Sequence, residues 1–169
     1  MRRILIIDTS ILCVWLGVPG KETCGSQDDR WDKKRVDNTL ESEKKQGAFF
    51  VLPLAVIIET GNHIAQSKKA WECANALCKI IRESLDARSP WVNFSQQNVL
   101  WSSEHLYGLI DKWPEYAKAK LSIGDMTIKT VAEYYAAGYN IVSILTGDEG
   151  LKAHEPAADL PVPRRRQKK

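Results

Sequence analysis

Cysteine and histidine are scarce in this sequence, and their spacing excludes the common zinc sites. The 169 residues include four cysteines and three histidines, and no two cysteines have the Cys-x-x-Cys spacing of a zinc ligand pair. A chain of this length also buries enough apolar surface to fold without a framework of disulfides. We therefore expect reduced thiols in or near a hydrophobic core.

An excess of charge of one sign is also lacking in the body of the chain. The chain has 24 Lys and Arg residues and 21 Asp and Glu residues, and five of the basic residues lie in 164–169. The balance excludes a basic nucleic-acid-binding domain and locates the positive excess in a tail. Two interpretations of this tail remain open, a solvated segment and one in which Arg164, Arg165 and Arg166 attract RNA phosphates.

No apolar run is long enough to span a membrane, which takes about 18 consecutive apolar residues. Arg2 and Arg3 precede the apolar stretch 4–18, which superficially resembles a signal peptide. Asp8 interrupts this stretch, and a carboxylate there opposes insertion into a bilayer. We expect a cytoplasmic protein with no membrane partner.

Short, largely apolar runs alternate with helical patterns along the chain. The predicted strands are 4–7, 49–52, 91–94 and 141–145. The predicted helices are 54–66, 69–86, a segment from Ser102 or Ser103 that Pro114 can interrupt, 122–138 and 149–154. Residues 11–17 are expected to begin a helix or turn, and the charged region 19–47 to form a loop followed by an exposed helix from about residue 28.

This alternation predicts an α/β fold, a three-layer α/β/α sandwich with a mostly parallel central sheet of four to five strands. The pattern continues to about residue 155, so we expect one domain over 1–155. The segment 156–169 is rich in Pro and Ala and then basic, which predicts a disordered tail.

Four carboxylates occupy positions that one edge of such a sheet brings together. Asp8 directly follows the first strand, Asp148 lies three residues past the last strand, Glu59 lies in the helix after the second strand, and Asp125 opens a helix. Ligands bind at the carboxyl edge of open parallel sheets. A cluster of acids there is tolerable when a cation fills it, and oxygen ligands favour one or two Mg²⁺ or Mn²⁺ ions.

Structural roles for the same acids remain open. Asp125 can form a capping box with Ser122, and Asp148 can be a helix N-cap. Asp8 and Glu59 lie in apolar stretches, where a carboxylate is costly without a partner, and this favours a functional role for them.

The segments 4–10 (ILIIDTS), 52–62 (LPLAVIIETGN), 121–135 (LSIGDMTIKTVAEYY) and 141–151 (IVSILTGDEGL) resemble, in this order, the motifs of the PIN-domain family of metal-dependent ribonucleases. The resemblance implies that Asp8, Glu59, Asp125 and Asp148 hold the metal, that Thr146 is the hydroxyl residue of the T/S-x-D motif, and that Thr9 and Ser10 help to organise the site. It also implies an endoribonuclease that leaves 5′-phosphate and 3′-hydroxyl ends. Such a protein can be the toxin of a toxin–antitoxin pair with an antitoxin or operon partner, a defence nuclease or a homodimer. The long region 19–47 and the basic tail depart from the small members of the family.

The roles of two further residues and two alternative functions for the protein also remain open. Asn62 and His63 lie one turn from Glu59 and could touch a phosphate, or be structural. An aspartyl phosphohydrolase is the first alternative, although Ser10 replaces the second acid of its usual D-x-D motif and no catalytic Lys motif follows. A non-catalytic nucleic-acid-binding module is the second.

Overall fold

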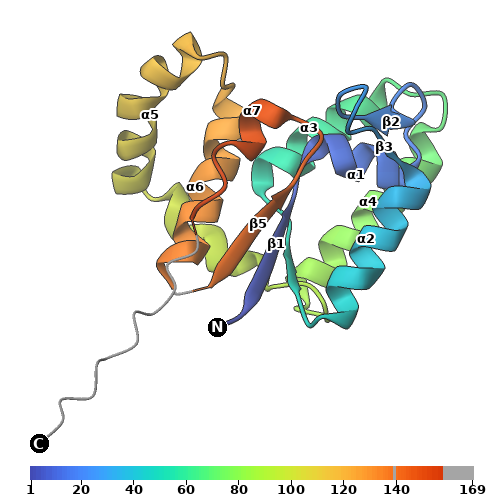
Figure 1. Ribbon diagram of the computed structural model, residues 1–169, viewed down its shortest axis with the longest axis horizontal. Helices are drawn as coiled ribbons and strands as arrows, with labels where there is room; N and C mark the ends of the chain where they lie inside the picture. Colours follow the sequence, from blue (N-terminus) through green and yellow to red (C-terminus); the bar gives the residue numbers. More distant parts are fainter. Residues whose placement is uncertain (139, 158–169) are drawn as a thin grey trace, which may run out of the picture.

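A small parallel sheet forms the centre of the molecule. The computed structural model describes residues 1–138 and 140–157. Strands β1 (Arg3–Ile7), β4 (Phe49–Val51) and β5 (Ile141–Leu145) pair in parallel in the order β4-β1-β5 (Figure 1). The central position of β1 explains its continuous apolar run, because both faces of a central strand are covered. The α/β class and these three strands are confirmed.

The described sheet has three strands instead of the four to five expected. Trp91 forms only an isolated parallel bridge with Phe50, and 94–101 is a 3-10 helix, η1 (Phe94–Trp101). Pro90 has no backbone N–H to extend the pairing, and the Asn93 side chain accepts from Ser95 N at 2.9 Å, which starts η1. The predicted strand 91–94 was therefore wrong, because local turn chemistry stops the pairing after one residue.

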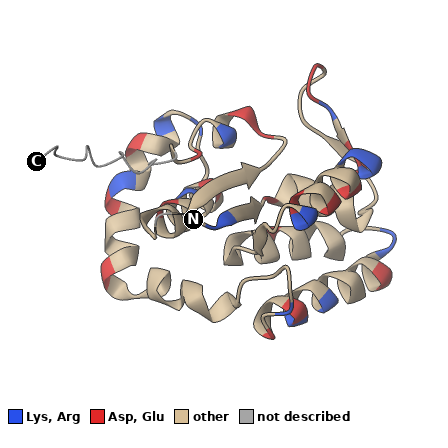
Figure 2. Cartoon of the chain, turned by 60° about the horizontal axis from the view of Figure 1, so that its bottom comes forward, with Lys and Arg blue, Asp and Glu red and all other residues tan. Residues whose placement is uncertain are grey.

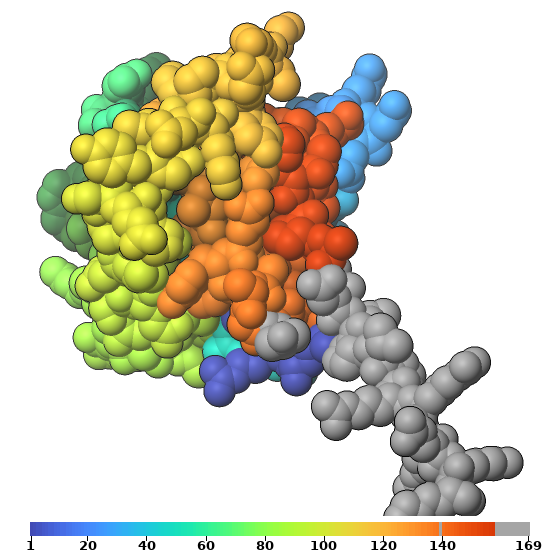
Figure 3. Space-filling view, turned by 90° about the vertical axis from the view of Figure 1, so that its left-hand side faces the viewer, coloured from blue at the N-terminus to red at the C-terminus, as the bar shows by residue number. Residues whose placement is uncertain are grey.

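Helices lie on both sides of the sheet, with α5 and α6 on one side and α1, α2 and α4 on the other (Figure 1). Figure 3 shows α5, in yellow, lying over α6, in orange. The helices are α1 (Thr9–Leu16), α2 (Lys33–Lys45), α3 (Leu54–Ala65), α4 (Ala70–Leu85), α5 (Ser103–Lys118), α6 (Ile123–Ala137) and α7 (Glu149–Lys152). The predicted helical segments are confirmed, and α5 continues through Pro114 without interruption.

The charged region 19–47 contains a short hairpin that the sequence pattern did not predict. Strands β2 (Thr23–Cys24) and β3 (Trp31–Asp32) pair antiparallel. Asp32 accepts from Arg35 N at 2.8 Å, so α2 begins at Lys33 and not near residue 28. The guanidinium of Arg35 lies 3.8 Å from the centre of the Trp31 ring, which fixes the hairpin to the helix.

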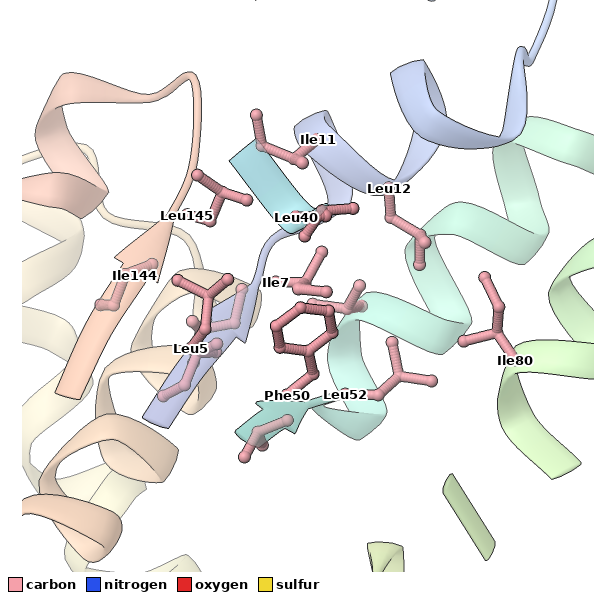
Figure 4. Packing of buried hydrophobic residues seen from close by; sticks show 14 of the residues in the cluster. Leu5, Ile7, Ile11, Leu12, Leu40, Phe50, Leu52, Ile80, Ile144 and Leu145 are labelled. Atoms are coloured by element: carbon pink, nitrogen blue, oxygen red, sulfur yellow. The ribbon is translucent and has the colours of Figure 1, made fainter. Parts of the chain in front are cut away.

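The core lies between the strands and the helices packed against them. Figure 4 shows Leu5, Ile7, Phe50 and Leu52 among the buried side chains of this cluster. A second, smaller cluster of Leu109, Leu121 and Met126 holds α5 against α6. All four cysteines are free thiols; Cys13 and Cys73 are buried and Cys24 is half-buried, as expected, whereas Cys78 is exposed.

Charged residues of both signs are interspersed along the helices and loops (Figure 2). Within residues 1–138 and 140–157, no helix has the length and apolar character needed to cross a membrane. The predicted tail residues Arg164, Arg165 and Arg166 lie outside the described residues.

Candidate acidic site

All four predicted acids line one pocket at the carboxyl edge of the sheet. The pocket has a volume of about 280 Å³. Asp8 reaches it from the junction of β1 and α1, Glu59 from α3, Asp125 from α6 and Asp148 from the loop after β5. These residues are far apart in the chain, and the parallel pairing of β1 with β5 brings the first and last of them to the same edge. The structure therefore places the predicted residues around a common space.

Asp8 is the most buried of the four acids and the most tightly held. The residue is 5% exposed, and its Oδ2 accepts from Ser10 Oγ at 2.7 Å and from Thr146 Oγ1 at 2.8 Å. Burial raises the pKa of the Asp8 carboxyl above its ordinary value, and the hydrogen bonds from Ser10 and Thr146 lower it by less. Any cation that enters the pocket therefore stabilises the ionised form of Asp8.

Hydroxyl groups tie the end of β1 to the loop after β5. Thr146 Oγ1 accepts from Asp148 N at 2.9 Å while it donates to Asp8. Ser10 Oγ likewise accepts from Gly147 N at 3.0 Å. Thr146 thus links the Asp8 carboxylate to the backbone of Asp148, and Ser10 links the same carboxylate to the backbone of Gly147.

Glu59 is positioned from two sides. Its Oε2 accepts from Thr9 Oγ1 at 2.9 Å, and its Oε1 occupies the space that a Cβ atom on Gly124 would need. The carboxylate therefore approaches the first turn of α6, where backbone N–H groups favour negative charge. Thr9 and Gly124 are the residues that permit this approach.

Asp125 and Asp148 also cap helices. Asp125 forms a capping box with Ser122, in which Asp125 N donates to Ser122 Oγ at 3.0 Å and Asp125 Oδ2 accepts from Ser122 N at 3.1 Å. Asp148 Oδ1 accepts from Gly150 N at 2.7 Å and from Leu151 N at 3.2 Å. Each cap uses one carboxylate oxygen, so the capping role and a role in the pocket are compatible.

The sequence pattern missed the residues that the hairpin region contributes. Lys21, Thr23 and Cys24 line the pocket together with Cys13 from α1. The chain reverses at Gly17, which has a left-handed φ of 67°, and 18–24 then returns over the start of α1. A glycine after a short helix predicts that the chain turns there, but it does not predict the direction in which the chain continues.

The two pocket thiols are held protonated at neutral pH. Burial raises the pKa of Cys13 to about 11 and also raises the pKa of Cys24. Cys24 packs so closely against Gly147 that a side chain at 147 would displace the hairpin. The thiols therefore act as packing groups between α1, the hairpin and the loop after β5.

The remaining predicted residues divide into two groups. His63 lines the pocket, whereas Asn62 is exposed and lies outside the lining. Among the described residues, no group of three or more His, Cys, Asp or Glu side chains lies close enough together to hold a metal ion. The acids therefore surround the pocket without forming a closed ligand cage.

Comparison with protein-family models, curated proteins and solved structures finds no match to this chain. The resemblance to the PIN-domain family thus rests on the four sequence segments alone.

Proposed function

We propose that this protein is a Mg²⁺- or Mn²⁺-dependent endoribonuclease of PIN-domain type. The observation that supports the proposal best is the pocket itself, where four carboxylates from four separate parts of the chain converge. Binding alone does not require the repulsion and desolvation that such a cluster costs. The proposal includes the finer fold description, a three-layer sandwich, and a cytoplasmic location.

The donor set fits a hard divalent cation. Mg²⁺ in phosphoryl-transfer sites is held by one or two carboxylates, substrate phosphate oxygens and several waters, so a closed cage of three protein ligands is not needed. Asp8 has Oδ1 left over, because its hydrogen bonds with Ser10 and Thr146 all use Oδ2. Asp8 and Glu59 would hold one ion, with Asp125 and Asp148 completing its surroundings. When bound, the metal supplies a water of lowered pKa and neutralises phosphate charge.

The other pocket residues act on the substrate and on the acids. Thr146 and Ser10 hold the Asp8 carboxylate in one orientation, and Thr9 does the same for Glu59. Lys21 brings a positive charge to a pocket of acids, where it can bind a phosphate that would otherwise be repelled. His63 lines the same pocket and can donate to a phosphate oxygen.

The first experiment is cleavage of a mixed pool of single-stranded and structured RNA by wild type and Asp8→Asn, with Mn²⁺, Mg²⁺ or EDTA. We expect wild-type cleavage that requires the metal and products with 5′-phosphate ends. The loss of one metal-binding carboxylate should lower cleavage by at least about a hundredfold. Full activity of Asp8→Asn, or of wild type in EDTA, would contradict the proposal.

A second candidate is an aspartyl phosphohydrolase, and one observation favours it. That chemistry needs a cation near the aspartate. Lys21 lines the pocket, although the sequence contains no recognisable catalytic Lys motif. Release of phosphate from small phosphate esters, with RNA left intact, would identify this activity. RNA binding that persists in EDTA without any turnover would instead indicate a non-catalytic module.

An apolar groove beside the acids supports the proposal that this protein binds a protein partner. Ile58, Ile110 and Ile123 are 55%, 49% and 47% exposed, and they line a groove of about 340 Å³ between α3, α5 and α6 that shares Glu59 with the acidic pocket. An inhibitory helix with an apolar face and a basic side chain would fit the groove and reach the acids, as in an antitoxin.

This partner is tested with the product of a neighbouring gene. We expect this gene product to inhibit RNA cleavage by wild type. It should bind the Ile110→Asp variant at least about tenfold more weakly than wild type, because binding would bury an unpaired charge in the groove. A homodimer in light scattering that Ile110→Asp dissociates would show that a second copy covers this face.

A further inference from the structure

A second cavity lies away from the acids and is lined by aromatic side chains. It has a volume of about 340 Å³ and lies between α2, β4 and the end of α4. Trp15, Phe50 and Trp91 line it, and no residue of this cavity lines the acidic pocket. Its size falls in the range of small-ligand sites, which begins at about 300 Å³.

The aromatic side chains form a rigid wall. The rings of Trp15 and Trp91 stack with centroids 6.4 Å apart, and Phe50 meets Trp91 edge to face at 5.7 Å. Backbone hydrogen bonds hold this wall, since Phe50 N donates to Pro90 O at 2.8 Å and Val92 N donates to Phe50 O at 2.9 Å. Trp15 is only partly buried, so part of its ring remains available for stacking.

Charges of both signs line the rim. Glu41 and Lys44 come from α2, and Glu83 comes from α4. Glu83 Oε2 accepts from Trp91 Nε1 at 3.3 Å, and among the described residues none donates to its Oε1. Lys44 likewise has no ion pair with a described residue. An acceptor and a cation are therefore both available next to a stacking surface.

We propose that this cavity binds a nucleotide. Its base stacks on Trp15, an exocyclic amino group of the base donates a hydrogen bond to Glu83, and its phosphate binds Lys44. An aromatic wall is suited to any base, a carboxylate accepts but does not donate, and an ammonium binds phosphate as a point charge. The acidic pocket, by contrast, has no Phe, Tyr or Trp among its lining residues in the described chain. The nucleotide can be free or part of an RNA strand.

The test follows the six tryptophan indole N–H signals by NMR during titration of the full chain. The probes are AMP, IMP, ribose 5-phosphate and a short single-stranded RNA, all in EDTA so that the proposed nuclease is inactive. We expect AMP to shift the signals of Trp15 and Trp91 and to leave that of Trp71 unchanged, because Trp71 is 76% exposed and outside the cavity. IMP should bind more weakly than AMP, because it presents a carbonyl in place of the amino group to Glu83.

Variants separate the contributions of the ring and the charge. Trp15→Leu should weaken AMP binding at least about fivefold, through loss of stacking. Lys44→Glu should weaken it about three- to fivefold, and Lys45→Glu, on the same exposed turn but outside the cavity, should leave it unchanged. The two lysine variants change exposed side chains, so they test the proposal even if Trp15→Leu does not fold.

The outcomes distinguish the sources of the ligand from failure of the proposal. Shifts with AMP alone support a free nucleotide, and shifts with RNA alone support a base of the strand. Equal shifts with ribose 5-phosphate, or no shift of Trp15 and Trp91 with any probe, would overturn the proposal. The result does not depend on the acidic pocket, so it stands or fails separately from the nuclease.

Discussion

Thr146 Oγ1 donates a 2.8 Å hydrogen bond to Asp8 Oδ2, although 138 positions separate the two residues in the chain. The same hydroxyl accepts from Asp148 N at 2.9 Å. A single buried hydroxyl therefore links the acid after the first strand to the acid after the last strand. This link makes the geometry of the site sensitive to one side chain.

Replacing Thr146 with Val should lower both cleavage and stability. The change keeps the shape but leaves Asp8 without one donor and Asp148 N without its acceptor, which costs about 1–3 kcal/mol for buried groups. Thermal unfolding and RNA cleavage measure the two effects. Thr130→Val is the matched control, because Thr130 only bonds back to Met126 O within α6; an equal loss of cleavage in both variants would contradict the prediction.

Asp8→Asn should stabilise the metal-free protein at neutral pH while it abolishes cleavage. Burial raises the folded-state pKa of Asp8 above its ordinary value of 3.8, so the folded protein binds this proton more tightly than the unfolded chain. The stability from this group is complete below about pH 3.8 and is lost as the pH rises through the raised folded-state pKa. Asn keeps an oxygen for Ser10 and Thr146 without the charge.

Thermal unfolding of both proteins in EDTA from pH 4 to 7 measures this difference. The advantage of Asp8→Asn should grow with pH and then level off at a few degrees in Tm, because about 1 kcal/mol shifts Tm by about 2–4 °C in a chain of this size. A variant that is less stable than wild type at pH 7 would show that the hydrogen bonds of the carboxylate outweigh its desolvation.

Gly124→Ala should lower cleavage without lowering stability. The added methyl group would occupy the place of Glu59 Oε1 and push that flexible carboxylate away, while Ala is the better helix former. Gly108→Ala in α5 is the control, because nothing lies within 4 Å of its added Cβ. We expect that variant to gain up to about 1 kcal/mol of stability with unchanged cleavage. Unchanged cleavage by Gly124→Ala would show that the position of Glu59 is unimportant.

Lys21→Ala should raise KM for RNA about three- to tenfold, and the effect should shrink at high salt because the contact is electrostatic. Lys34→Ala, an exposed lysine on α2, should leave KM unchanged. Binding of Mn²⁺ should not weaken in Lys21→Ala, because a cation is removed from beside the acids. A fall in kcat with no change in KM would assign Lys21 to the chemical step instead of to substrate binding.

Local patterns were sufficient for most of the fold. The apolar runs at 4–7, 49–52 and 141–145 and the helical spacings between them correspond to observed elements, because each is set by residues close together in the chain. The segment 91–94 has the composition of a strand, but Pro90 and the cap at Asn93 decide its conformation. The hairpin within 19–47 has strands of two residues each, which are too short to leave a periodic pattern.

The sequence by itself determined the class of fold and which acids lie after strands or at helix starts. It determined these because a charge inside or directly after an apolar run, as at Asp8 and Glu59, is visible without coordinates. Only the tertiary structure decided that Lys21 and Cys24 join the acids, that Glu59 depends on Gly124, and that Trp15 and Trp91 form one wall. Those relationships join residues far apart in the chain, and their distances follow from packing of the hairpin and helices on the sheet, which no local pattern encodes.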